Sequence, residues 1–132
     1  MIKVFNELYS DLTDTLVASF SNIKTSSVYT NTPSSYPFVS VEEINNSIYQ
    51  NGMDDSHIEN FVNLDYEINI YTKNPNKKSN GDKILDLVDK YFTELGFVRT
   101  TKQIMPTNDE TLYRVVVQYS AVCSQNKTIY RR

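Results

Sequence analysis

Residues 80–122 have the sequence NGDKILDLVDKYFTELGFVRTTKQIMPTNDETLYRVVVQYSAV, and this stretch decides the fold class. Apolar residues recur in it at three- and four-residue steps, which predicts an amphipathic helix that begins at Ser79 or Asn80 and ends at Gly96. Two strands are predicted after the glycine, and a polar loop joins them. The stretch contains no group suited to catalysis. The predicted helix stripe is Ile84, Leu87, Val88, Tyr91, Phe92 and Leu95, the strands are 97–102 and 112–122, and the loop is 103–111.

The chain before this stretch predicts another helix and a set of strands. Apolar residues at helical spacing over 3–19 predict a first helix with an acidic solvent side. Strict alternation over 60–72 predicts a strand with one packed and one polar face, which is typical of an antiparallel sheet. The remaining segments are a short strand at 28–31, a proline loop at 32–37, a strand at 38–44, a polar turn or hairpin at 45–59 and a lysine-containing connection at 73–79.

These elements predict an α+β fold, a two-layer sandwich. Their order is α-β-β-β-α-β-β, and two helices on one face of a mainly antiparallel sheet bury every apolar stripe. A length of 132 residues corresponds to a single domain over 1–132, with a polar C-terminal tail at 124–132.

Charge is distributed unevenly along the chain. Residues 1–98 hold 7 Lys/Arg and 14 Asp/Glu, a net charge of −7, and residues 99–132 hold 6 and 2, a net charge of +4, so the whole chain carries −3. Such asymmetry suits head-to-tail packing of subunits, and scattered solvated charge is the alternative. A net negative charge argues against a dedicated nucleic-acid binder.

Cys123 is the single cysteine, so no disulfide forms within the chain, which fits a reducing compartment. Its place in or beside an apolar strand favours a small buried side chain. No apolar run reaches the roughly 18 residues of a membrane helix, and the N-terminal segment lacks a signal-peptide core. We expect the protein to be made and used in the cytosol.

Enzymatic chemistry through an imidazole would depend on His57, the single histidine. This residue lies in the acidic segment 54–59, which lacks the spacing of a calcium loop or a zinc site, so a solvated loop is favoured. Glu42 and Glu43 are adjacent on a strand and point to opposite faces, so they do not form a carboxylate pair. The chain also lacks a Gly-x-Ser-x-Gly elbow and a phosphate-binding glycine loop. We therefore predict no catalytic residue, metal ligand or cofactor.

Two groups of residues are candidates for interactions. The polar face of the 60–72 strand carries Phe61 and Tyr71 among acids and amides, and large aromatic side chains on a polar face often mark a contact with another protein. Partial cover by a neighbouring loop is the alternative. Asp65 and Glu67 share this face, where solubility or contact with another subunit explains them better than acid–base chemistry.

The basic residues form the second group. The loop from Lys73 to Lys78 holds three lysines, and Arg131 and Arg132 make a basic end. Either could contact a phosphate backbone, so a small adaptor or nucleic-acid-contacting module is the alternative function. A solvated turn is the simpler interpretation of the lysines.

Several segments in order resemble one known family. They are YPFVSVEE at 36–43 with Asn46 and Ser47, YEINIY at 66–71, LVD at 87–89 with LGFVRT at 95–100, and YRVVVQYSA at 113–121. In this order and spacing they resemble tail terminator proteins of long-tailed bacteriophages and prophages, which are also described as tail completion, head–tail joining or minor capsid proteins. The closing IYRR at 129–132 is similar to the prophage version.

The resemblance implies a small α/β subunit that closes into a ring, commonly a hexamer, at the head-proximal end of the tail tube. The ring ends tube growth and offers a surface to the head connector, without catalysis or a cofactor. Its partners would be further copies of the chain, the tail tube protein and the head–tail connector. The virion is the expected location, after assembly in the bacterial cytoplasm. Membrane contact, a small-molecule substrate and direct nucleic-acid binding are not expected.

Within such a ring, loops at 45–59, 73–80 and 103–111 are expected to project toward the partners. We assign subunit contact to Phe61, Asp65, Glu67 and Tyr71, and contact with a partner or the rim to Lys77 and Lys78.

Overall fold

The computed structural model describes residues 4–28, 33, 35–48, 61–107, 109–124 and 129–130. The elements follow the predicted order of helices and strands, with one further short strand at the end. They are α1 (Phe5–Ser19), β1 (Lys24–Ser26), β2 (Phe38–Ile48), β3 (Phe61–Lys73), α2 (Lys77–Leu95), β4 (Val98–Met105), β5 (Leu112–Ser124) and β6 (Ile129–Tyr130).

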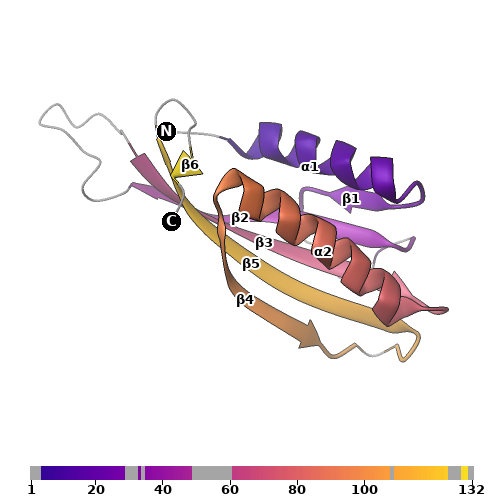
Figure 1. The fold of residues 1–132 in the computed structure, drawn as a ribbon. Coiled ribbons are helices and arrows are strands. Elements are labelled where there is room, and N and C mark those ends of the chain that lie inside the picture. Colours follow the sequence, from indigo (N-terminus) through magenta and orange to yellow (C-terminus); the bar gives the residue numbers. More distant parts are fainter. Residues whose placement is uncertain are drawn as a thin grey trace, which may run out of the picture.

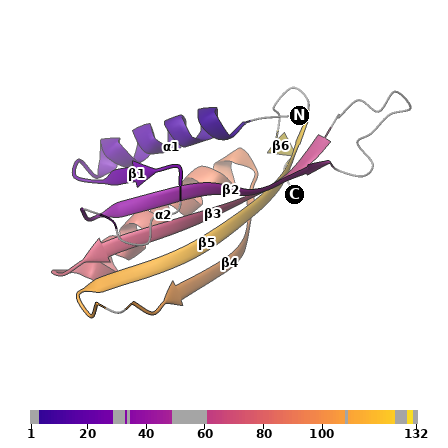
Figure 2. The ribbon, with the colours of Figure 1, turned by 180° about the vertical axis from the view of Figure 1, so that it is seen from behind.

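The described strands form one six-stranded sheet with the order β1-β2-β3-β5-β4, and β6 also pairs with β5. β1 runs parallel to β2, and the other pairs are antiparallel. Both helices lie on one face of this sheet (Figure 1), and the view from behind shows the opposite face without a helix over it (Figure 2). The predicted α+β sandwich with a mainly antiparallel sheet is confirmed.

The core lies between the sheet and the two helices. Alternate residues of β3 point into it, because side chains of a strand project to opposite faces in turn. Their partners on β5 and the apolar stripes of both helices complete the cluster. The fully buried members from these elements are Leu12, Leu16, Val62, Leu64, Tyr66, Ile68, Ile70, Val88, Phe92, Val115, Val117, Tyr119, Ala121 and Cys123.

The start of α2 differs from the prediction. The helix begins at Lys77, before the predicted start at 79–80, and its N-cap Asn76 has a left-handed backbone with φ 62° and no capping side-chain hydrogen bond. Gly81 consequently lies inside the helix. A Cβ at this position would lie 2.7 Å from the Tyr113 ring, so the glycine permits close packing of α2 on β5.

The end of α2 lies at the predicted glycine. Gly96 has φ 101°, a left-handed conformation that favours glycine, and its N–H donates to the carbonyl of Thr93 at 3.0 Å. The N–H of Phe97 donates to the carbonyl of Phe92 at 2.9 Å, and the Phe97 side chain is buried. This arrangement caps the last turn and directs the chain into β4.

Replacing Gly96 by alanine is expected to lower the free energy of unfolding by about 1–2 kcal/mol, because a Cβ is strained in the left-handed region. Asparagine tolerates this conformation better, so Gly96→Asn should cost less than Gly96→Ala. Urea unfolding of both variants checks the order. An alanine variant as stable as the wild type would contradict the role of Gly96 as a left-handed cap.

Strand ends also differ from the prediction. The short strand predicted at 28–31 is wrong at Val28, which lies in a bend, and β1 occupies Lys24–Ser26 instead because these residues pair with the start of β2. β2 continues past its predicted end at 44, since a bulge after Glu43 lets its last residues pair with β3. The loop predicted at 45–59 is therefore strand up to Ile48, and residues 49–60 lie outside the described residues.

The prediction of a polar loop at 103–111 and a polar tail at 124–132 is wrong in part. β4 extends to Met105, because Gln103, Ile104 and Met105 find partners on β5. β5 runs through Ser124, and the two residues of β6 pair with Cys123 and Val122. Parts of both segments are strands because they pair with a neighbouring strand. The polarity of their own residues does not predict that pairing. Cys123 is fully buried, as its apolar surroundings predicted.

Candidate interaction surfaces

The helix-free face of the sheet holds three of the residues assigned to subunit contact, Asp65, Glu67 and Tyr71. Asp65 and Glu67 lie on the central strand β3, at positions that alternate with the buried ones. The Asn45 amide donates to Asp65 Oδ2 at 2.8 Å, and the Gln118 amide donates to Glu67 Oε1 at 3.2 Å. Both carboxylates are half-buried and held by neighbouring strands, so they present fixed negative charge on this face.

Tyr71 shares this face but is only 3% exposed. Its ring makes an edge contact with Phe38 at 6.3 Å between centroids, and the guanidinium carbon of Arg114 lies 5.4 Å from the ring centroid. Arg114 also donates two hydrogen bonds to Asn69 Oδ1, at 3.1 and 2.8 Å. Tyr71 therefore belongs to a packed cluster, whereas an exposed docking aromatic was expected. The side chain of Phe61 lies outside the described residues.

Two of the three lysines between the end of β3 and the start of α2 are engaged within the chain. Lys77 Nζ donates to the carbonyl of Glu110 in the turn before β5. Lys73 Nζ lies 5.8 Å from the centroid of the Tyr36 ring, within reach of a cation–π interaction. Lys78 is exposed at the start of the helix. Arg131 and Arg132 lie outside the described residues.

The candidate catalytic residues do not come together in the described part of the chain. His57 and the acidic segment around it lie outside the described residues. Glu43 accepts a hydrogen bond from the hydroxyl of the buried Tyr66 at 3.0 Å, while Glu42 pairs with Glu67 across the strands, so the two neighbours serve opposite faces. Within the described ranges, no group of three or more His, Cys, Asp or Glu side chains could hold a metal ion.

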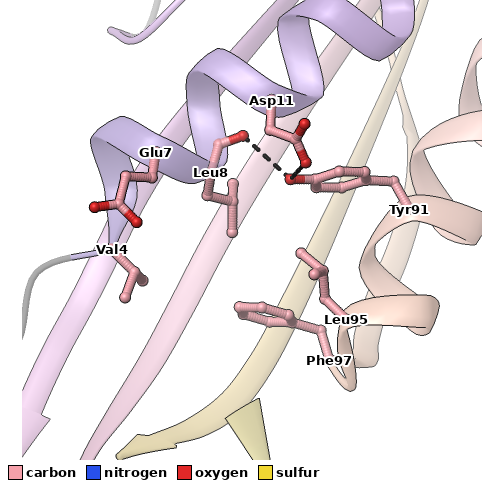
Figure 3. A pocket seen from close by; sticks show the side chains of 7 residues that line it. All are labelled: Val4, Glu7, Leu8, Asp11, Tyr91, Leu95 and Phe97. Carbon is pink, nitrogen blue, oxygen red and sulfur yellow. Dashed lines mark hydrogen bonds between the residues drawn. The ribbon is translucent and has the colours of Figure 1, made fainter. Parts of the chain in front are cut away.

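A cleft of about 280 Å³ opens between α1 and α2 (Figure 3). At its centre the Tyr91 hydroxyl donates to Asp11 Oδ2 at 2.9 Å and lies 3.4 Å from the carbonyl oxygen of Leu8. Burial, together with the hydrogen bond to Asp11, raises the pKa of the Tyr91 hydroxyl above its ordinary value of 10.0, so the hydroxyl keeps its proton into the alkaline range. The cleft is lined by Val4, Glu7, Leu8, Asp11, Tyr91, Leu95 and Phe97.

A second hollow of about 370 Å³ shares Asp11, Tyr91 and Leu95 with the first. Together the two hollows follow the seam between the helices, with apolar walls and acidic side chains at the rim. The Tyr91–Asp11 hydrogen bond ties the helices together across this seam. Helical periodicity predicted Tyr91 in the apolar stripe and Asp11 on the solvent side. It could not predict their contact, because that contact depends on how the two helices pack.

Comparison of the chain with models of known protein families finds no match. A search of curated proteins also finds no matching sequence. Neither described helix is long and apolar enough to cross a membrane. Functional inference for this chain therefore rests on its own residues and their arrangement.

Proposed function

We propose that this chain is a structural subunit of a bacteriophage or prophage virion, a tail terminator that forms a ring at the head-proximal end of the tail. The ring ends growth of the tail tube and joins the tail to the head connector. The observation that carries the proposal is where the segments that resemble the family lie in the fold. They occupy one continuous block of the sheet together with α2.

These segments lie in the strands of the block and in α2. Residues 36–43 lead into β2, 66–71 lie in β3, 87–89 lie in α2, 95–100 run from the end of α2 into β4, and 113–121 lie in β5. In the sheet these strands are neighbours in the order β2-β3-β5-β4. The resemblance therefore covers the central scaffold of the subunit, which supports a shared architecture more strongly than scattered matches would.

The surfaces that the fold leaves open suit a protein that works by contact. Neither described helix lies over one face of the sheet, and this face carries the held carboxylates of Asp65 and Glu67. In place of the subunit contact expected for Asp65 and Glu67, we assign this face to the tail tube protein or the connector, with Lys78 near the rim. Further copies of the chain form the ring, and no cofactor takes part.

Purified chain mixed with a tail tube protein of the same phage or prophage should end tube growth. Electron microscopy of the polymerised tubes is expected to show a ring at one end and a shorter length distribution than in tubes grown alone. Reversing the charges on the helix-free face, Asp65→Lys with Glu67→Lys, should weaken capping about tenfold, because complementary charges at an interface become like charges.

The matched control reverses two exposed acids of the helical layer, Asp86→Lys with Glu94→Lys, and should cap as the wild type does. Circular dichroism of both double variants verifies that they are folded. Tubes that grow to the same length with and without the chain, and that carry no ring, would refute the proposed function.

A further inference from the structure

The sheet has open strands at both of its ends. Among the described strands, β4 pairs with β5 alone and β1 pairs with β2 alone, so each leaves one row of backbone N–H and C=O groups without a strand partner. α1 lies over the β1 end, where Thr25 of β1 is hydrogen-bonded to Tyr9 at 3.0 Å and to Thr13 at 3.3 Å. Neither of the two described helices covers β4 at the other end (Figure 1).

Exposed apolar side chains gather at the same two ends. Val17 on α1 is 45% exposed and Val28, just after β1, is 63% exposed. On β4, Val98 is 38% exposed and Ile104 is 59% exposed. Among the described residues, Ile44 is the one other large apolar side chain with such exposure. Single exposed apolar residues are ordinary, but here they occur on both open ends of one sheet.

The two ends carry opposite charge. α1 contains the acids Glu7, Asp11 and Asp14 and no basic residue, while β4 contains Arg99 and Lys102 and no acidic residue. One acid of α1 and one basic residue of β4 have no hydrogen-bond or ion-pair partner among the described residues.

Arg99 pairs with Asp89 at 3.2 Å, and Asp11 accepts from Tyr91. Asp14 and Lys102 are both exposed and make no hydrogen bond or ion pair with the described residues. Lys24 is the basic residue of β1, and its register partner Phe38 places it on the helix-free side, away from α1.

Two exposed residues of β4 lie on the side of the sheet that the helices cover. Lys102 pairs with Val117 and Ile104 pairs with Val115, and both valines face the helices. Directly paired residues project to the same side of a sheet, so Lys102 and Ile104 lie on the helix side of β4. That side is the one a helix would cover if another helix followed α2 in the layer.

We propose that the α1–β1 end of one copy docks on the β4 end of the next copy. The α1 helix of the neighbour then covers the helix side of β4, as α2 covers β5 within a subunit, with Val17 against Ile104 and Asp14 against Lys102. The contact joins two different surfaces, so repetition gives a closed ring when the rotation per copy permits. This inference rests on the proposed role as a ring subunit, and it leaves the helix-free face to the tube and connector.

A charge exchange tests the contact. Lys102→Glu and Asp14→Lys should each weaken self-association about tenfold in sedimentation velocity over a concentration series, because each variant brings like charges together. An equimolar mixture of the two variants should associate as the wild type does, since every contact between unlike variants again pairs opposite charges. The expected product alternates the two variants around the ring.

Lys83→Glu and Asp86→Lys are the matched controls, because they make the same changes of net charge at exposed positions of α2; they should associate as the wild type does. The docking contact is overturned if the mixture associates no more strongly than each variant alone, or if the wild type is monomeric at every concentration. The tube assay separates the two proposals. If the chain caps tubes but neither substitution weakens its self-association, the contact alone is refuted. If both substitutions weaken self-association but the chain does not cap tubes, the proposed function alone is refuted.

Discussion

Replacing Phe92 by alanine is expected to lower the free energy of unfolding by about 3–5 kcal/mol, the cost of removing a large aromatic side chain from a packed core. Phe92 is fully buried, and its ring stacks on Tyr119 with 4.4 Å between centroids and 8° between planes. The ring also makes an edge contact with Phe97 at 5.2 Å. Its removal opens a cavity where α2 meets the sheet, and the surrounding rings can close it only in part. Urea unfolding followed by circular dichroism measures the loss.

Two further variants test whether the loss of stability comes from the lost apolar volume at a buried position. Phe92→Leu retains much of the apolar volume and should cost clearly less than Phe92→Ala. Ile44→Ala removes apolar atoms from a side chain that is 47% exposed, so it should change stability by less than about 1 kcal/mol. If Phe92→Ala proves as mild as Ile44→Ala, the aromatic cluster is not the centre of the core.

Alkaline pH should unfold the protein, because buried tyrosines resist ionisation. Burial, with Glu43 adding to it, raises the pKa of Tyr66 above its ordinary value of 10.0, and burial together with the hydrogen bond to Asp89 raises the pKa of Tyr119. Above pH 10 the unfolded chain loses these protons while the folded chain keeps them. The free energy of unfolding therefore falls with rising pH, by about 1.4 kcal/mol per pH unit for each tyrosine. Below pH 10 these groups cause no change.

Tyrosinate absorbance and circular dichroism recorded together from pH 9 to 12 test this expectation, and both signals should change in one cooperative step. Tyr66→Phe and Tyr119→Phe each remove one of the two protons. Each variant should therefore show a shallower fall of stability with pH, although each also loses a hydrogen bond worth about 1 kcal/mol at neutral pH. Ionisation of all tyrosines near pH 10 in a chain that stays folded would refute the buried hydroxyls.

The proposed contact between the α1–β1 end and the β4 end follows from the charge pattern of the sequence and from the strand order of the sheet. Composition along the chain separates an acidic segment in 1–98 from a basic one in 99–132. It does not say where these charges lie in space. The strand order puts the β1 end, which α1 covers, and the β4 end on opposite sides of one sheet. Arg99 pairs with Asp89 and Asp11 accepts a hydrogen bond from Tyr91, whereas Lys102 and Asp14 have no partner among the described residues.

The sequence by itself determined the features that depend on a few adjacent residues. Alternation over 60–72 predicted β3, because side chains of a strand point to opposite faces in turn. The apolar stripe of α2 and its end at Gly96 were predicted too, since helical periodicity and the left-handed conformation of glycine are local properties. The same local rules identified Asp65 and Glu67 as residues of one face.

Only the tertiary structure decided the features that depend on partners distant in the chain. Gly81 belongs inside α2 because the Tyr113 ring packs against it, and β6 exists because Cys123 and Val122 offer it an edge. Tyr71 is buried because Phe38 and Arg114 cover it. Periodicity states which way a side chain points within its own element. Which elements become neighbours is set by the burial of all apolar stripes at once, and this decides which ends of the sheet remain open.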